Sequence, residues 1–254
     1  MGRLRSFAEK MSRNQVLSRH LPKDLNSALI YVSPDASLSQ WSPRLQSDLF
    51  DLAREFVHPG DTIWDIGANV GLFTIAAAQK AGPTGYVLAI EPDIWLAALL
   101  QRTAAAQHPN TAPIHIMQVA VSGATGTETL HIAKRNRASN HLSSVPEHSQ
   151  AGGTRETYEV QCITLDSLLE QIPDQTPPPN LIKIDIEGSE IDLLNASHRL
   201  LTTIRPIIMC ESQHRNRPAV TTIFNRYNYK LYDWDTNPRV EVQTAAFNTL
   251  AIPI

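Results

Sequence analysis

Short runs of apolar and β-branched residues alternate with helix-like patterns from residue 62 onward. In the first unit, DTIWDIG predicts a strand, ANVGLFTIAAAQK a turn and a helix, and GYVLAIEP the next strand, with Gly82 and Pro83 breaking the helix. A second helix is expected over residues 93–107, and a third strand in IHIMQVAVS. This alternation is typical of βαβ units around a parallel sheet, so we predict an α/β fold.

The pattern changes between residues 134 and 156, where polar residues dominate and large apolar side chains are few. Two extended segments, ETLHIA and TYEVQCITL, flank this polar stretch. We expect the stretch to contribute nothing to a core. It is either a surface excursion or a mobile cover over a substrate, because long loops in compact domains often serve as lids or binding loops.

The alternation resumes after the polar stretch. A helix is expected in LDSLLEQI, a strand in LIKIDIEG, a helix over residues 190–201, a strand in PIIMCE and a helix over residues 218–227. The chain closes with two strands, YKLYDWD and FNTLAIPI. Their short connection cannot house a crossover helix, so at least one end strand should run antiparallel to the rest.

The composition supports one substantial domain. A chain of 254 residues with 42% hydrophobic and 19% charged content can bury a sizeable core. We assign residues 46–254 to this domain, with the polar loop at 134–156 inside it. Residues 1–45 are expected to form a helical N-terminal extension, whose first part is basic and therefore typical of a solvated face.

Charge and cysteine usage narrow the classes of partner. A formal net charge of −3 gives no reason to expect a nucleic-acid partner. Cys162 and Cys210 lie in apolar stretches and not at metal-ligand spacing, so both are expected to be buried thiols. We expect no membrane span and no secretion signal, and hence a cytoplasmic protein. Nothing in the sequence sets its oligomeric state.

The segment DIGANVG is the most informative turn in the chain, because a buried strand ends in Asp65 and a helix begins near Gly71. Glycine allows positive φ and a close approach of a ligand to the backbone. The start of a helix also presents free N–H groups to an anionic group. The residues that we expect to bind a cofactor are Asp65, Gly67, Ala68, Asn69, Gly71 and Glu91.

Two classes of cofactor compete for such a turn. A dinucleotide fingerprint requires G-x-G-x-x-G, but Asn69 stands where the middle glycine would be. Asp65 would repel a pyrophosphate but could accept hydrogen bonds from an ammonium group. Glu91 ends the second strand, where a carboxylate can accept both hydroxyls of a ribose. An amino acid joined to a nucleoside describes S-adenosylmethionine. A nicotinamide-dependent oxidoreductase and a non-catalytic nucleoside-binding protein are the alternatives.

In DIGANVG, AIEPD, LIKIDIEGSEIDLL and PIIMCE, taken in order, the chain resembles the FkbM-type S-adenosylmethionine-dependent methyltransferases. KIDIEGSE, which looks like the K-x-D-x-E-G-x-E hallmark of that family, is the specific signal. The resemblance extends from about Leu49 to the C-terminus. It implies a Rossmann-like methyltransferase fold, with a mostly parallel seven-stranded sheet, an antiparallel C-terminal strand and helices on both faces. It also implies methyl transfer to a hydroxyl of a sugar, polyketide or other small molecule.

The carboxylates of KIDIEGSE divide by strand alternation. Asp185 and Glu187 should face the ligand edge of the sheet, whereas Glu190 should fall in the first turn of a helix and complement its dipole. A base for an acceptor hydroxyl must lie within hydrogen-bond reach of it. The predicted catalytic residues are Asp185, Glu187, Glu211 and His214. His141 on the polar stretch is a further candidate.

Grouped carboxylates could also hold a divalent cation that orients a hydroxyl. Spacing along one chain cannot place three side chains around one ion. We therefore predict no metal ligand, and the acceptor is expected to be a small molecule or a glycan.

Overall fold

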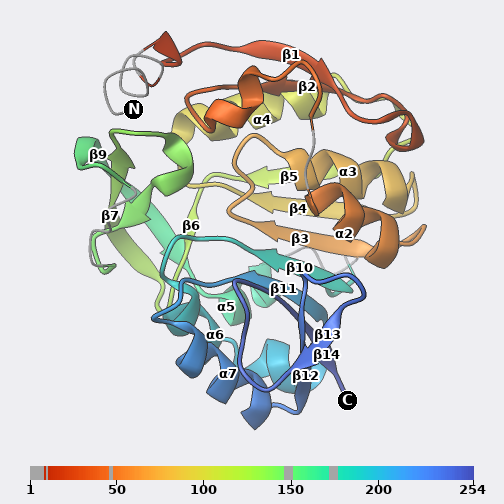
Figure 1. The fold of residues 1–254 in the computed structure, drawn as a ribbon, viewed down its shortest axis with the longest axis vertical. Helices are drawn as coiled ribbons and strands as arrows, with labels where there is room; N and C mark the ends of the chain where they lie inside the picture. Colours follow the sequence, from red (N-terminus) through yellow and green to blue (C-terminus); the bar gives the residue numbers. More distant parts are fainter. Residues whose placement is uncertain (1–8, 10, 46–47, 146–150, 172–176) are drawn as a thin grey trace.

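The computed structural model describes residues 9, 11–45, 48–145, 151–171 and 177–254. A mixed sheet of eight strands, in the order β13-β12-β14-β11-β10-β3-β4-β5, forms its centre (Figure 1). In chain order its strands are β3 (Thr62–Ile66), β4 (Tyr86–Ile90), β5 (Ile114–Met117), β10 (Leu181–Ile184), β11 (Ile207–Glu211), β12 (Tyr229–Asp233), β13 (Val240–Val242) and β14 (Asn248–Pro253).

The direction of the strands confirms the Rossmann-like α/β fold. Strands β5, β4, β3, β10 and β11 are parallel, and β14 is antiparallel to both of its neighbours, β11 and β12. The sheet has eight strands and not the expected seven, because the connection between the last two predicted strands contains β13, which pairs with the outer edge of β12. The parallel strands end together, and this edge carries the site described below.

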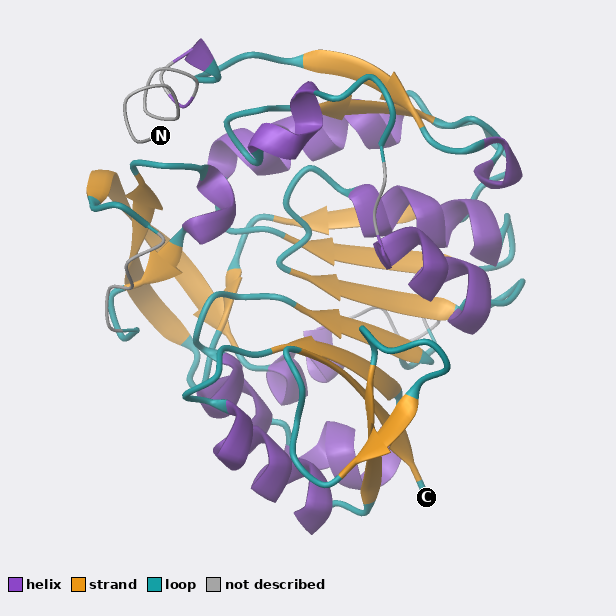
Figure 2. Ribbon diagram, in the orientation of Figure 1, coloured by secondary structure: helices purple, strands orange, loops and turns teal. Residues whose placement is uncertain are grey.

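Helices cover both faces of the sheet, as Figure 2 shows. The helices α2 (Asp48–Phe56), α3 (Leu72–Ala81) and α4 (Ile94–Ala105) pack on one face, against Leu181 of β10 and Met209 of β11. The opposite face is covered by α5 (Leu165–Gln171), α6 (Glu190–Asn195) and α7 (Arg217–Arg226), which pack against Ile182 and Ile184 of β10. A short π-helix, η4 (Leu200–Ile204), follows α6 where one longer helix was expected.

A second sheet stands beside the end of the first. It contains β6 (Ala120–Val121), β7 (Gly126–Ala133), β8 (His141–Leu142) and β9 (Thr154–Ile163) in the order β6-β9-β7-β8. The single strand expected in IHIMQVAVS is therefore divided between β5 and β6, which belong to different sheets. The two extended segments that flank the polar stretch are confirmed as β7 and β9.

The expectation that the polar stretch contributes nothing to a core is wrong for its described residues. Leu142 is buried in a small cluster with Leu130 and Val160 of the second sheet. A 3-10 helix, η3 (Arg137–Ser139), precedes β8 and is held by buried polar contacts. The reason is that charged side chains of this stretch find buried partners, which a count of apolar residues does not reveal.

The helical extension expected over residues 1–45 is wrong for residues 15–45; residues 9 and 11 are helical, and residues 1–8 and 10 lie outside the described part of the chain. Between residues 15 and 45 the chain forms an antiparallel pair, β1 (Leu17–His20) and β2 (Leu29–Val32), and two 3-10 helices, η1 (Lys23–Leu25) and η2 (Leu38–Trp41). Figure 1 shows the strand pair lying along α4. Ile30 and Val32 belong to the same buried cluster as Phe73 and Leu96, so this segment is part of the main core.

Among the described residues, no helix combines the length and the apolar character that crossing a membrane would require.

Candidate active site

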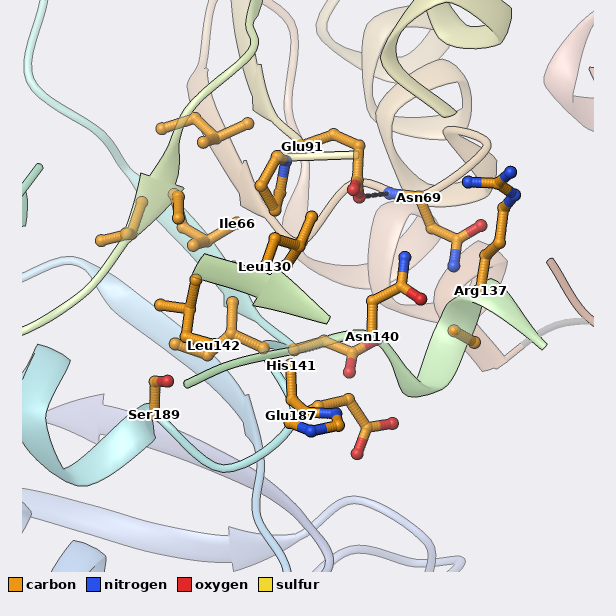
Figure 3. Close-up of a pocket in the computed structure, with 18 of the residues that line it drawn as sticks. Ile66, Asn69, Glu91, Leu130, Arg137, Asn140, His141, Leu142, Glu187 and Ser189 are labelled. Carbon is orange, nitrogen blue, oxygen red and sulfur yellow. Dashed lines mark hydrogen bonds between the residues drawn. The ribbon is translucent and has the colours of Figure 1, made fainter. Parts of the chain in front are cut away.

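Two cavities meet at the edge where the parallel strands end. The first cavity, of about 210 Å³, lies between the turn after β3, the end of β4, the second sheet and the loop after β10 (Figure 3). The second cavity, of about 310 Å³, lies between α2, β10, β11 and the residues around Trp234 and Asn248. Asp185 and Glu211 line both cavities, so these two carboxylates stand at their junction.

The glycine turn forms one wall of the first cavity. Gly67 has φ +78°, and a Cβ there would lie 1.9 Å from the carbonyl oxygen of Asp185. A glycine is therefore required where the turn after β3 touches the loop after β10. Of the predicted cofactor residues in this turn, Gly67 and Asn69 line the cavity. Ala68 is buried beside it, and Gly71 caps α3 with φ +89°.

Glu91 lies at the end of β4 in the wall of the first cavity. Its Oε2 accepts a hydrogen bond from the Asn69 N–H (2.8 Å, drawn in Figure 3), and its Oε1 accepts one from the Asp93 N–H (2.9 Å). Burial, strengthened by the nearby charge of Asp93, raises the pKa of Glu91 to about 8. Each carboxylate oxygen retains a second lone pair, which can accept a ligand hydroxyl.

Asp65 is not among the residues that line either cavity; it is fully buried under the turn. Its Oδ2 accepts a hydrogen bond from Thr74 Oγ1 (2.6 Å), and its Oδ1 lies 3.2 Å from Lys183 Nζ. Lys183 Nζ also donates to the Gly67 carbonyl oxygen (2.8 Å) and lies 3.4 Å from Asp185 Oδ2. Burial opposes its charge, but the carboxylates of Asp65 and Asp185 outweigh burial and raise the pKa of Lys183. Lys183 thus joins the glycine turn to the loop after β10.

The structure brings three of the four predicted catalytic residues together. Oxygen atoms of Asp185, Glu187 and Glu211, the carboxylate trio, lie within 4.8 Å of one another. Burial, followed by the negative charge of Asp185, raises the pKa of Glu187 to about 7 and that of Glu211 to about 8. Acids with such pKa values gain and lose protons near neutral pH, as a general base must. Three clustered oxygens are also the ligand type that a hard divalent cation prefers.

The fourth predicted catalytic residue, His214, is exposed and lines neither cavity. It lies three residues beyond the end of β11, and this distance carries it out of the site. Glu190 does begin α6, as expected, but it is buried and does more than face the helix dipole. Its carboxylate accepts hydrogen bonds from the Gly188 N–H (2.6 Å) and from Asn216 Nδ2 (2.8 Å), which ties the loop after β10 to α7.

Sequence reasoning missed Arg137, which lines the first cavity from η3. Its guanidinium is almost fully buried and pairs with Asp35 of the N-terminal segment and with Asp93 at the start of α4. Asn140, beside it in the cavity wall, donates to Asp93 Oδ2 (2.9 Å). Figure 3 shows Arg137, Asn140 and His141 along one side of the cavity. The sequence offers no local signal for these contacts, because Asp35 and Arg137 are 102 residues apart.

The raised pKa of Glu211 predicts a pH-dependent effect on stability. The folded protein keeps this proton up to about pH 8, whereas an unfolded chain releases it near the ordinary value of 4.5. Stability from this group is therefore present below pH 4.5 and is lost as the pH rises to 8. We expect the change in Tm caused by Glu211→Gln to be about 2–4 °C more positive at pH 9 than at pH 5.

Thermal unfolding of both proteins across this pH range measures the difference. Glu159→Gln, which alters an exposed acid on β9, serves as the matched control and should shift Tm equally at all pH values. A Glu211→Gln effect that is the same at pH 5 and pH 9 would contradict the assigned pKa.

The fold and this edge of the sheet define a Rossmann-like methyltransferase: a glycine turn follows the first parallel strand, a buried carboxylate ends the second, and acids cluster beyond the fourth. The chain belongs to the FkbM methyltransferase family, because the domain model of that family matches residues 65–233. The enzymes of this family depend on S-adenosylmethionine, and the cofactor of this protein is therefore S-adenosylmethionine.

Two curated relatives are similar over part of their length. The chain is 25% identical over 171 residues to the hexuronic acid methyltransferase AglP of Haloferax volcanii, which covers 65% of this chain and 62% of that protein. It is 29% identical over 150 residues to methyltransferase 1 of Beauveria bassiana, which covers 54% of this chain and 58% of that protein. The chain thus spans less than two thirds of both relatives.

Among solved structures, a methyltransferase FkbM from Methylobacillus flagellatus aligns with 80% of this chain and 50% of its own, at 16% identity and a TM-score of 0.47. An S-adenosylmethionine-dependent O-methyltransferase from Thermotoga maritima aligns with 85% of this chain and 69% of its own, at 10% identity and a TM-score of 0.44.

The first cavity has the donors and acceptors that S-adenosylmethionine requires. Glu91 offers free lone pairs to the two ribose hydroxyls, and Ile90 and Val119 give an apolar wall for a flat base. Ser189 Oγ is a buried polar atom in the same wall, and within the described part of the chain it has no hydrogen-bond partner. An unpaired buried hydroxyl is costly unless a ligand satisfies it, so the cavity fits a polar ligand.

Proposed function

We propose that the protein transfers the methyl group of S-adenosylmethionine to a hydroxyl oxygen of a small molecule or glycan. The observation that carries this proposal is the position of Asp185 and Glu211, which line both the first and the second cavity. With the cofactor in the first cavity and the acceptor in the second, the carboxylate trio lies at the point where the two ligands meet. The hexuronic acid methyltransferase of Haloferax volcanii supports a sugar as the acceptor.

The protein binds the cofactor through the first cavity in this proposal. Glu91 accepts the ribose hydroxyls, and the backbone of Gly67 and Asn69 lies against the amino-acid part. Asp65 stays a predicted cofactor residue, but its contacts with Thr74 and Lys183 favour an indirect role in which it holds the turn.

Methyl transfer depends more on aligning the acceptor with the methyl group than on general acid–base catalysis. When bound, S-adenosylmethionine supplies a methyl group that its positive sulfonium makes electrophilic. The chain's own residues must hold the acceptor hydroxyl in line with that methyl group. A carboxylate of the trio would take the proton that the acceptor hydroxyl loses when it receives the methyl group. Lys183, 3.4 Å from Asp185 Oδ2, keeps that carboxylate in place.

Two alternatives predict other outcomes. A nicotinamide-dependent oxidoreductase is disfavoured by Asn69 in the turn and by the family of the chain. A non-catalytic nucleoside-binding protein would bind S-adenosylmethionine and transfer nothing. The retained acids at the junction of the two cavities favour catalysis.

The test is incubation with methyl-labelled S-adenosylmethionine and host extract, followed by mass spectrometry of labelled products. A label that survives mild alkali excludes a methyl ester, which hydrolyses under those conditions, and fragmentation of the labelled product then distinguishes a methyl ether from a methyl group on nitrogen or sulfur. Labelled esters alone would replace the hydroxyl acceptor by a carboxylate. The absence of any labelled product across extracts and pH values would overturn the proposed activity.

The role of Glu91 gives a direct prediction for the cofactor. Glu91→Gln replaces one carboxyl oxygen by an NH₂ group, which then faces a backbone N–H that donates to this side chain in the native protein. We expect S-adenosylmethionine to bind about 10- to 100-fold more weakly, since a buried donor left without an acceptor costs about 1–3 kcal/mol and disturbs the wall of the first cavity. Titration calorimetry measures the change, with Glu159→Gln as the control. Unchanged affinity in a folded Glu91→Gln variant would remove Glu91 from the cofactor site.

A further inference from the structure

The second cavity continues into a third. The third cavity, of about 400 Å³, lies between α2 and the loop after β12. Asp48 and Trp234 line both of them. Together the two cavities form a groove, the acceptor groove, that runs from Asp185 and Glu211 past Asp48 and Trp234 to Asp235. The two cavities, of about 310 Å³ and about 400 Å³, together give room for an acceptor of more than one sugar unit.

The inner half of the acceptor groove is acidic. Asp48, Asp185 and Glu211 line it, and Lys183 is its one cation among the described residues. That ammonium group is already shared between Asp65 at 3.2 Å and Asp185 at 3.4 Å, so its charge is offset inside the protein. A ligand in this half therefore meets the carboxylates of Asp48 and Asp185, and Glu211 adds a further negative charge as the pH rises above about 8.

The outer half of the groove is also negatively charged. Arg239 lines it, but its guanidinium forms two hydrogen bonds with the carboxylate of Glu55 and lies 3.7 Å from the centre of the Trp234 ring. Within the described segments, neither Asp48 nor Asp235 forms an ion pair with a cation. Asp235 Oδ1 accepts a hydrogen bond from Asn248 Nδ2 (2.8 Å), which leaves its other oxygen available. The groove thus ends in carboxylates that lack counterions of their own.

The chemistry of this lining selects a ligand class. Carboxylates accept strong hydrogen bonds from hydroxyl and ammonium groups and repel other carboxylates. The Asn248 amide beside them suits a ligand that carries several hydroxyls, whereas Trp234 is buried under Arg239 and shapes the wall without offering an open ring face. Resting on the proposed function, we propose that the acceptor is a neutral or amino oligosaccharide without acidic groups, bound along the acceptor groove. It differs in charge from the acidic sugar named for the Haloferax volcanii relative.

Three trisaccharides of similar size and different charge test this proposal. Triacetylchitotriose is neutral, chitotriose is cationic and trigalacturonic acid is anionic at neutral pH. Binding to the full chain is measured by calorimetry at low ionic strength with saturating S-adenosylhomocysteine, so that no turnover is needed. We expect the neutral or the cationic probe to bind at least about tenfold more tightly than the anionic one, because like charges at short range are repelled. The tighter of the two identifies the neutral or the amino class.

Substitutions in the acceptor groove provide a second test of the proposed acceptor class. Asp48→Lys and Asp235→Lys should each reduce this preference, by about threefold or more, and raise the affinity for trigalacturonic acid. Glu159→Gln, an exposed acid away from the groove, should leave the preference unchanged. Thermal unfolding shows that each variant is folded before its affinity is compared.

Preferred binding of the anionic probe, binding that ignores charge, or binding of none of the three would overturn the proposed acceptor class. These outcomes are separable from failure of the proposed function. Binding is measured without methyl transfer, whereas the proposed function fails when no acceptor in any extract receives the label.

Discussion

Lys183→Met is expected to lower the free energy of unfolding by about 3–5 kcal/mol, because it leaves Asp65 as a buried charge without a counterion. Asp65 has no exposed surface, and its remaining polar partner would be the Thr74 hydroxyl at 2.6 Å. The Gly67 carbonyl oxygen, 2.8 Å from Lys183 Nζ, would lose its donor as well. For a chain of this size the loss corresponds to a fall in Tm of about 6–20 °C. Denaturant unfolding monitored by circular dichroism measures it.

The double variant Asp65→Asn with Lys183→Met shows whether the cost comes from the orphaned charge. Removing both charges should recover at least about half of the lost stability, since breaking a buried pair costs more than replacing it. The matched control is Lys230→Met, which breaks an exposed ion pair with Glu241 and should cost less than about 1 kcal/mol. A Lys183→Met variant as stable as this control would disprove the role of the buried pair. S-adenosylmethionine affinity of the folded double variant also tests the predicted contact between Asp65 and the cofactor.

The buried pair shows where sequence reasoning about the site ends. Asp65 was predicted to face the cofactor because it ends a strand before a glycine turn. The prediction did not include the partner that register gives Asp65: Lys183 on β10 is paired directly with Asp65 on β3, so the two side chains share one face of the sheet. The register between strands more than 100 residues apart depends on tertiary packing, and no spacing along the chain reveals it.

The carboxylate trio was predictable for the opposite reason. β10 and β11 are parallel neighbours, so acids placed after both strands must meet at one edge of the sheet. The same logic placed Glu91 at the end of β4. It failed for His214, because three further residues turn the chain away from that edge. Strand-end residues are thus predictable, whereas spacing alone does not place the loop residues beyond them: Glu187, three residues after β10, joins the trio, and His214, three residues after β11, does not.

The structures of the N-terminal segment and of η3 were not predicted, because their side chains pair with residues more than 100 positions away in the sequence. LSRH and LIYV do carry an alternating burial pattern, but the basic residues before them favoured a solvated helix. Arg155 binds both carboxylate oxygens of Asp35 at 3.1 Å, and Arg137 binds Asp35 and Asp93. These buried pairs make a polar sequence fold as an ordered wall of the first cavity. A composition rule that treats charge as exposure cannot anticipate them.

Asp185→Asn is expected to slow methyl transfer by about 10²–10⁴-fold, the range that loss of a general base covers. Asp185 is the first to test, because it lines both cavities and its contact with Lys183, 3.4 Å from its Oδ2, fixes it at their junction. Asparagine has the same shape and keeps an oxygen for Lys183, so the fold and the turn should persist. Single-turnover kinetics with a labelled acceptor from the extract experiment measures the rate, and calorimetry measures cofactor affinity.

Cofactor affinity is the readout that separates catalysis from binding in this variant. If Asp185 takes the proton of the acceptor hydroxyl, kcat falls while the Kd of S-adenosylmethionine changes by less than about threefold. A carboxylate that mainly holds the cofactor would give the reverse pattern. Asp192→Asn, which changes an exposed acid on α6, is the matched control and should leave both values unaltered. An Asp185→Asn enzyme that retains full kcat would move the base to Glu187 or Glu211, whose pKa values of about 7 and about 8 suit the same step.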